Sequence, residues 1–129
     1  MLGRSPFDDQ SGQEFLQWFA HQGGVPSAVF DNVSPAGTDL AGATQLDIGL
    51  SVIRATAANA GVRLPDAAVG ALVQVVNADG ADTIKIWPND ALVTLDLIGL
   101  GVGLNTTLAA GATAQFTRVS STEWLLIKP

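Results

Sequence analysis

Strand periodicity in this chain is clearest in the stretch Thr44-Gln45-Leu46-Asp47-Ile48-Gly49-Leu50-Ser51-Val52. Four apolar side chains alternate there with small or polar ones, at Leu46, Ile48, Leu50 and Val52. Because successive side chains of a strand point to opposite faces, the alternation predicts a strand with these four residues buried on one face. The stretch therefore indicates a fold built from β-strands.

The chain after this stretch reads as further short strands separated by turn signals. We expect them over residues 62–65, 69–76, 83–87, 91–100, 112–117 and 124–127, with 62–65 at a sheet edge because of its proline. The turn Asn77-Ala78-Asp79-Gly80 predicts one hairpin, and Ser120-Ser121-Thr122 predicts a second that closes the chain. No internal repeat is evident. The pattern predicts a mainly β fold, an antiparallel β-sandwich or barrel of about six to eight strands.

The first 43 residues differ from the rest in composition and in sequence pattern. Five of the eight aromatic residues lie there: Phe7, Phe15, Trp18, Phe19 and Phe30. Ser11-Gly12-Gln13-Glu14 has the form of a capping box, which predicts a short helix over about 11–22. Residues 25–43 are rich in Pro, Gly, Ser and Asn, which favours an extended connector. We therefore expect an N-terminal arm at 1–43 and a β domain at 44–129.

The aromatic residues of the arm need a covering surface. Phe15, Trp18 and Phe19 share one face of the predicted helix through their i, i+3, i+4 spacing. Rings of this size each bury about 150–250 Å². The covering surface is either the chain's own β domain or another subunit, and the sequence leaves both open. All five aromatic residues of the arm, including Phe7 and Phe30, are candidate interface residues.

Glycines recur on every second position in the segment that ends at Leu104, at Gly99, Gly101 and Gly103. In a strand this spacing leaves one face without side chains, which favours the close approach of another strand or subunit. The three glycines therefore join the interface candidates. A dinucleotide-binding loop is excluded, because Leu104 stands where its third glycine would be and no βαβ unit surrounds the segment.

Composition excludes most familiar enzyme chemistry. The 129 residues include no cysteine and one histidine, His21, so thiolate metal sites and paired histidine ligands are excluded. We interpret Asp79, Asp82 and Asp90 as turn residues and not as a metal site. A serine nucleophile would need His21 as its base, on an arm without a fixed position. We expect no cofactor, no metal and no catalysis.

The charge balance narrows the possible partners. Only 14% of residues are charged, and the net charge is −6 at pH 7. An acidic chain of this kind lacks a basic patch large enough to bind nucleic acid. The longest uncharged apolar run falls well short of the roughly 20 residues of a membrane span, and the first residues show no apolar export signal. We expect an unexported chain that binds neither nucleic acid nor membrane.

From about residue 41 to residue 129 the chain resembles small β-rich structural proteins of tailed bacteriophages. The resemblance lies in Val62-Arg63-Leu64-Pro65, the strand from Ala71 to Asn77, Thr83-Ile84-Lys85-Ile86-Trp87-Pro88, the run from Leu108 to Ala112 leading to Phe116, and Glu123-Trp124-Leu125. Proteins of this kind serve as capsid decoration (cement) proteins or as fibre and tail components, commonly as trimers. The resemblance transfers no functional residue.

What the resemblance implies is a non-enzymatic virion structural protein, made in the host cytoplasm. It would bind the lattice of the major capsid protein on the outer surface of the capsid, stabilise the shell, and associate with itself as a homotrimer. Two alternatives stay open. One is a tail, head-fibre or baseplate component. The other is a carbohydrate-binding β module that presents Trp87 and Trp124 on a flat face.

Overall fold

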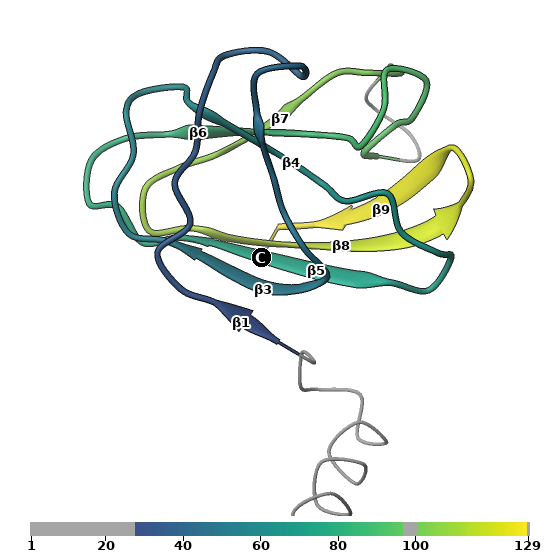
Figure 1. The fold of residues 1–129 in the computed structure, drawn as a ribbon, viewed down its shortest axis with the longest axis horizontal. Helices are drawn as coiled ribbons and strands as arrows, with labels where there is room; N and C mark the ends of the chain where they lie inside the picture. Colours follow the sequence, from purple (N-terminus) through teal and green to yellow (C-terminus); the bar gives the residue numbers. More distant parts are fainter. Residues whose placement is uncertain (1–27, 97–100, 129) are drawn as a thin grey trace, which may run out of the picture.

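The computed structural model describes residues 28–96 and 101–128 (Figure 1). All regular structure in these residues is β, which confirms the predicted class. Nine short strands are described: β1 (Val29–Phe30), β2 (Thr44–Gln45), β3 (Gly49–Ile53), β4 (Gly61–Arg63), β5 (Leu72–Asn77), β6 (Ile84–Trp87), β7 (Thr106–Leu108), β8 (Thr113–Ser120) and β9 (Glu123–Ile127).

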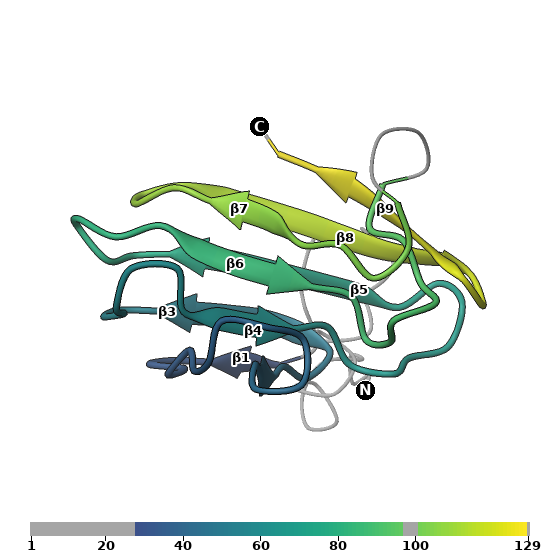
Figure 2. The same ribbon diagram turned by 90° about the horizontal axis from the view of Figure 1, so that it is seen from above.

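The strands form two sheets that lie face to face, as Figure 2 shows from above. Sheet A has the order β1-β3-β5-β8-β9, and sheet B has the order β2-β4-β6-β7. Both sheets are mixed. In sheet A, β1, β3 and β5 run parallel, as do β2, β4 and β6 in sheet B, whereas β7, β8 and β9 pair antiparallel. The predicted antiparallel sandwich or barrel is therefore wrong in its strand pairing.

The first six strands alternate between the two sheets along the chain. Parallel neighbours need a crossover connection, and here each strand of one sheet belongs to the crossover between two strands of the other. Gly49 pairs with Val73 in sheet A, and Gly61 pairs with Lys85 in sheet B. Both pairs have the same offset of 24 residues (73 − 49 and 85 − 61). Two windings of the chain are thus stacked in register, a repeat that is not evident in the sequence.

One predicted hairpin and two predicted strand assignments change, and the second hairpin is confirmed. The hairpin expected of 69–76 with 83–87 does not form, because β5 lies in sheet A and β6 in sheet B. The predicted edge piece at 62–65 overlaps β4, which lies between β2 and β6. Within 91–96 only an isolated bridge from Thr94 to Glu123 is present. The closing hairpin is confirmed, because β8 and β9 pair antiparallel around their turn.

The stretch from Thr44 to Val52 belongs to both sheets, because it contains β2 and the beginning of β3. Leu46 is buried as predicted, and Ile48 is exposed. The prediction is also wrong for Leu50 and Val52, which lie on the outer face of sheet A, whereas the next residues along, Ser51 and Ile53, are buried. The chain thus changes sheets within one run of alternating residues, and the buried side changes with it.

Gly49 stands where this change of sheet is completed. Its φ of 129° lies in the region that favours glycine, and a Cβ there would lie 2.5 Å from the carbonyl oxygen of Ala28. The glycine therefore lets the chain enter β3 directly beside the start of β1. The sequence periodicity hides this change of direction because glycine also fits the small, polar positions of the alternation.

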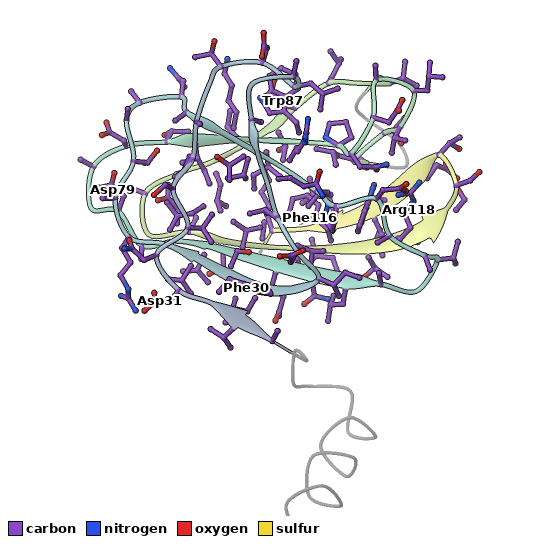
Figure 3. All side chains as sticks on the ribbon, viewed as in Figure 1. Phe30, Asp31, Asp79, Trp87, Phe116 and Arg118 are labelled. Carbon is purple, nitrogen blue, oxygen red and sulfur yellow. The ribbon has the colours of Figure 1, made fainter. Side chains whose placement is uncertain are left out.

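One hydrophobic core fills the space between the sheets. Its buried side chains come from both layers: Leu46, Ile53, Val62, Leu64, Val73, Val75, Ile84, Ile86, Val93, Leu95, Leu108, Ala114, Phe116 and Trp124. Phe116 lies between the two layers in Figure 3. Full burial of a side chain of this kind contributes about 1.5–3 kcal/mol. The core therefore holds the two sheets together over their whole length.

Residues 28–43 belong to the β domain, which begins no later than Ala28. Phe30 pairs with Ser51 of β3, on the side of sheet A that faces the core, so it is an element of the sheet and not of a free arm. Arg54 donates a hydrogen bond to Asp31 at 2.8 Å and thereby lowers the pKa of that carboxyl. The predicted helix over 11–22 lies outside the described residues, as do Phe7, Phe15, Trp18 and Phe19.

Asn77 connects the two sheets at the end of β5. Its buried side chain donates from Nδ2 to the carbonyl oxygens of Asp82 (2.8 Å) and Leu108 (3.0 Å). Its Oδ1 accepts a hydrogen bond from the backbone amide of Asp79 at 3.2 Å. Since Leu108 is in β7, one side chain joins sheet A to sheet B.

We predict that Asn77→Leu lowers the free energy of unfolding by about 2–4 kcal/mol, because the carbonyl groups of Asp82 and Leu108 lose their donors in a buried setting. Urea unfolding followed by circular dichroism measures the change. Thr113→Val, on the outer face of β8, is the matched control and should stay within about 0.5 kcal/mol of the parent. A parent-like midpoint for Asn77→Leu would contradict the linking role.

Candidate interaction surface

Three of the nine large apolar side chains that are exposed in the described residues lie in the connection between β6 and β7. Leu92, Val102 and Leu104 are 72%, 56% and 52% exposed. We call these three residues the apolar tip. Large apolar side chains left in water near one another mark surfaces that bind other molecules. The tip is therefore the first candidate for a functional surface in the described part of the chain.

A turn at Asp90 places Leu92 on the surface. The carboxylate oxygen Oδ1 of Asp90 accepts a hydrogen bond from the amide of Leu92 at 2.9 Å, and the amide of Val93 donates to the Asp90 carbonyl at 3.2 Å. This bonding is the reason that Asp is common in turns, and it confirms the interpretation of Asp90. Val93 and Leu95 follow at once and are buried in the core. Leu92 is thus exposed on a segment that the core anchors.

The segment that returns towards β7 lies directly against this turn. The amide of Gly103 donates to the carbonyl of Val93 at 2.8 Å. Gly103 has a φ of 70°, and a Cβ there would lie 2.7 Å from the carbonyl oxygen of Ala91. Glycine is therefore required at this position for a close approach within the chain itself. This approach brings the two segments of the apolar tip together.

The three candidate glycines have different outcomes. Gly103 lies in a turn and approaches Ala91 of its own chain closely. Gly101 is exposed, and a Cβ there would lie in ordinary contact with Leu104, at 3.4 Å from Cδ1. Gly99 lies outside the described residues. Neither described glycine is in a strand, so the predicted glycine-lined strand face is absent from this part of the chain.

A buried arginine supports the base of the connection. Arg118 is 5% exposed and donates to the carbonyl oxygens of Ser120 and Ser121, at 2.6 Å each. It also donates to Oδ1 of Asn89 at 3.1 Å, and the same oxygen accepts from the indole nitrogen of Trp124 at 3.0 Å. The guanidinium carbon lies 5.2 Å from the centre of the Trp124 ring, a cation–π distance.

Backbone hydrogen bonds join this base to the neighbouring loops. Gly70 donates to the carbonyl of Arg118 at 2.8 Å, and Thr94 donates to Thr122 at 2.9 Å. The β4–β5, β6–β7 and β8–β9 connections therefore meet at one end of the molecule, on the right in Figure 1, and Figure 3 shows Arg118 at that end. A surface held in place before binding loses less conformational entropy when a partner docks.

Sequence reasoning missed Arg118, although a signal for it was present. The alternation of Ala114 and Phe116 with polar residues places position 118 on the same buried face of the strand. An arginine at a buried position of a strand needs acceptors for its donors. The pattern therefore predicts a buried arginine network, but it does not identify Asn89 as a partner.

The residues considered for catalysis or metal binding are not assembled into a site. Asp79 accepts the amide hydrogen of Ala81 in the β5–β6 turn, which lies at the opposite end of the fold from the β6–β7 connection in Figure 1. Ser51 is buried in the interior. Within 28–96 and 101–128, no three His, Cys, Asp or Glu side chains lie close enough to hold a metal ion. His21 lies outside these ranges.

The two tryptophans considered for a glycan-binding face lie in different places. Trp124 is fully buried in the core. Trp87 is half-buried on the outer face of sheet B, with Nζ of Lys85 6.0 Å from its ring centre. Figure 3 shows Trp87 on the side of the upper sheet away from Phe116. Trp87 and Trp124 therefore do not form one flat face, which corrects that expectation.

Comparisons with known proteins add no family to this description. No protein-family model matches the sequence, and no curated protein is significantly similar to it. In the part of the chain that the structure describes, no helix is long and apolar enough to cross a membrane. The resemblance to phage structural proteins therefore stays a prediction.

We predict that Arg118→Met lowers the free energy of unfolding by about 2–3 kcal/mol, because the oxygens of Ser120, Ser121 and Asn89 lose their charged donor at once. Differential scanning calorimetry and urea titration measure the effect. Arg63→Met is the control: it removes the same group from the outer face of sheet B, where its acceptors lie at 3.4 Å. Equal effects of the two substitutions would contradict a special role for Arg118.

Proposed function

We propose that this chain is a non-enzymatic virion structural protein that binds the outer surface of a phage capsid as a decoration protein and stabilises the shell. The observation that supports the proposal is the apolar tip, because Leu92, Val102 and Leu104 stay in water on a base that Arg118 fixes. Exposed apolar side chains beside an anchored turn are suited to act as the anchors of a contact with another protein. The resemblance of the β-rich region to phage structural proteins gives that surface its identity.

The stabilising effect follows from linkage. A protein that binds the assembled lattice and not the free subunits lowers the free energy of the assembled state. Burying a Leu or Val side chain fully at such a contact contributes about 1.5–3 kcal/mol. Many copies on one shell would multiply this effect, so no catalytic group is needed for the function.

Self-association is part of the proposal. The low share of charged residues, 14% of the chain, matches the depletion of charge found at subunit interfaces. A trimer would present three apolar tips, and their binding to three neighbouring lattice subunits would be cooperative through effective concentration.

A tail, head-fibre or baseplate component is the second candidate, because the same tip would serve a contact to a neighbouring ring. Copy number separates the two: a decoration protein occurs in hundreds of copies per particle and a tail component in a few. A carbohydrate-binding role is less well supported, because Trp87 is half-buried and Trp124 is in the core.

We predict that Leu92→Asp weakens binding to undecorated shells of the phage that encodes the chain by about thirtyfold or more, the usual effect of losing a central anchor. Co-sedimentation at increasing protein concentration measures the affinity. The thermal midpoint should stay near that of the parent, because the Leu92 side chain is exposed.

Ala58→Asp is the matched control for this variant. It adds the same charge in the β3–β4 connection, at the other end of the fold, and should bind shells like the parent. Equal binding by Leu92→Asp and the parent would refute the tip as the contact. Failure of the parent to bind shells at all would refute the decoration role.

We also predict that multi-angle light scattering of the full chain gives three times the 13.3 kDa of one molecule at micromolar concentration. The expected mass follows from the proposed homotrimer, and it should persist on dilution across the range in which shells are bound. A mass of one chain under these conditions would contradict self-association and leave shell binding to be judged by co-sedimentation.

A further inference from the structure

Over its five strands the outer face of sheet A carries a single charged side chain, Glu123 at the start of β9, which accepts a hydrogen bond from Ser120 at 3.0 Å. The other strand positions on this face include Val29, Leu50, Val52, Leu72, Gln74, Val76, Thr113, Gln115, Thr117, Leu125 and Ile127. The register carries one row across the whole sheet, from Val29 through Leu50, Gln74 and Gln115 to Ile127. Most of these side chains are apolar, although the core lies on the opposite face.

The outer face of sheet B, in contrast, carries charged and polar side chains. Its outward positions include Arg63, Lys85 and Thr107. Sheets with one face on the core ordinarily carry polar residues on the other face. Sheet A departs from that rule, and its outer face therefore has the composition of a covered surface.

The chain outside the described residues enters at the edge of this face. Residues 1–27 join the structure at Ala28, next to Val29 of the edge strand β1. Neighbouring strands lie about 4.8 Å apart, so β5 is about 10 Å from β1 across the sheet. The five residues 23–27 can span up to about 17 Å when extended. Residues before Gly23 can therefore reach the centre of the face without leaving their own domain.

The same segment carries the side chains that need cover. Phe7, Phe15, Trp18 and Phe19 lie within residues 1–27. Each ring requires about 150–250 Å² of partner surface. A segment attached through a short connection meets its own domain at a far higher effective concentration than it meets another molecule.

We propose that the outer face of sheet A is the docking site for residues 7–19 of the same chain, with the aromatic side chains seated over β3, β5 and β8. The docked segment shields the apolar row from water. This inference is independent of the proposed shell contact, because the apolar tip lies in the connections at one end of the sheets.

The test uses the full chain labelled with 5-fluorotryptophan. Fluorine NMR then gives one resonance each for Trp18, Trp87 and Trp124, and Trp18→Phe assigns the first. The change of shift between H₂O and D₂O reports the exposure of each ring. We expect the Trp18 resonance to show a small, buried-type isotope shift that does not change on dilution.

Gln74→Arg places a charge at the centre of the face and should raise the isotope shift of Trp18 several-fold, towards that of free tryptophan. Trp124 reports the core, and its unchanged resonance shows that the variant is folded. Gln115→Arg repeats the experiment on β8 if the first variant does not fold. Thr107→Arg, on the exposed outer face of sheet B, is the control and should leave Trp18 as in the parent.

Three results would overturn the inference. The first is a Trp18 ring that is exposed to solvent in the parent. The second is burial that is lost on dilution, which would assign the face to the arm of a second copy. The third is burial that persists in a folded Gln74→Arg or Gln115→Arg variant, which would place the ring on another surface.

Discussion

The fold depends on the alternation of the chain between two facing sheets. Each strand from β1 to β6 lies in the sheet opposite to its predecessor, so parallel neighbours in one sheet are connected through a strand of the other. Parallel pairing needs a long crossover, and this chain provides it without a helix in the described residues. β7, β8 and β9 then pair antiparallel and complete both sheets.

This winding places the connections at the two ends of the molecule. At one end the β4–β5, β6–β7 and β8–β9 connections surround Arg118, which is buried against Trp124 and satisfied by the oxygens of Ser120, Ser121 and Asn89. Burying a guanidinium is costly unless its donors are bonded, so the network fixes the positions of the loops that supply the oxygens. Asn89, which accepts hydrogen bonds from Arg118 and Trp124, is anchored in this way at the start of the β6–β7 connection that carries the apolar tip. The buried charge of Arg118 thus holds the start of the connection that carries Leu92.

The apolar tip and the outer face of sheet A differ in physical character. The apolar tip is a small group of side chains on loops, with high exposure and a fixed base, as expected of a contact to a separate protein. The outer face of sheet A is broad and mostly half-buried, its strands carry one charged residue, Glu123, and it begins where residues 1–27 enter the domain. One surface is therefore suited to assembly with a partner, and the other to a segment of the same chain. The outer face of sheet B carries the charged residues Arg63 and Lys85, as expected of a face in contact with solvent.

The sequence alone determined the features that depend on neighbours along the chain. The β class, the closing hairpin of β8 and β9, the turn at Asp90 and the burial of Leu46 all follow from local alternation and turn chemistry. Only the tertiary structure decided which strands pair. Each residue of β3 pairs with a residue of β5 that is 24 positions further along the chain (73 − 49), and local alternation carries no signal for a partner at that distance. It also decided that Leu50 and Val52 face outward, since the change of sheet before Gly49 shifts the buried side by one residue. A strand's alternation shows that its two faces differ, but the sheet opposite decides which face is buried.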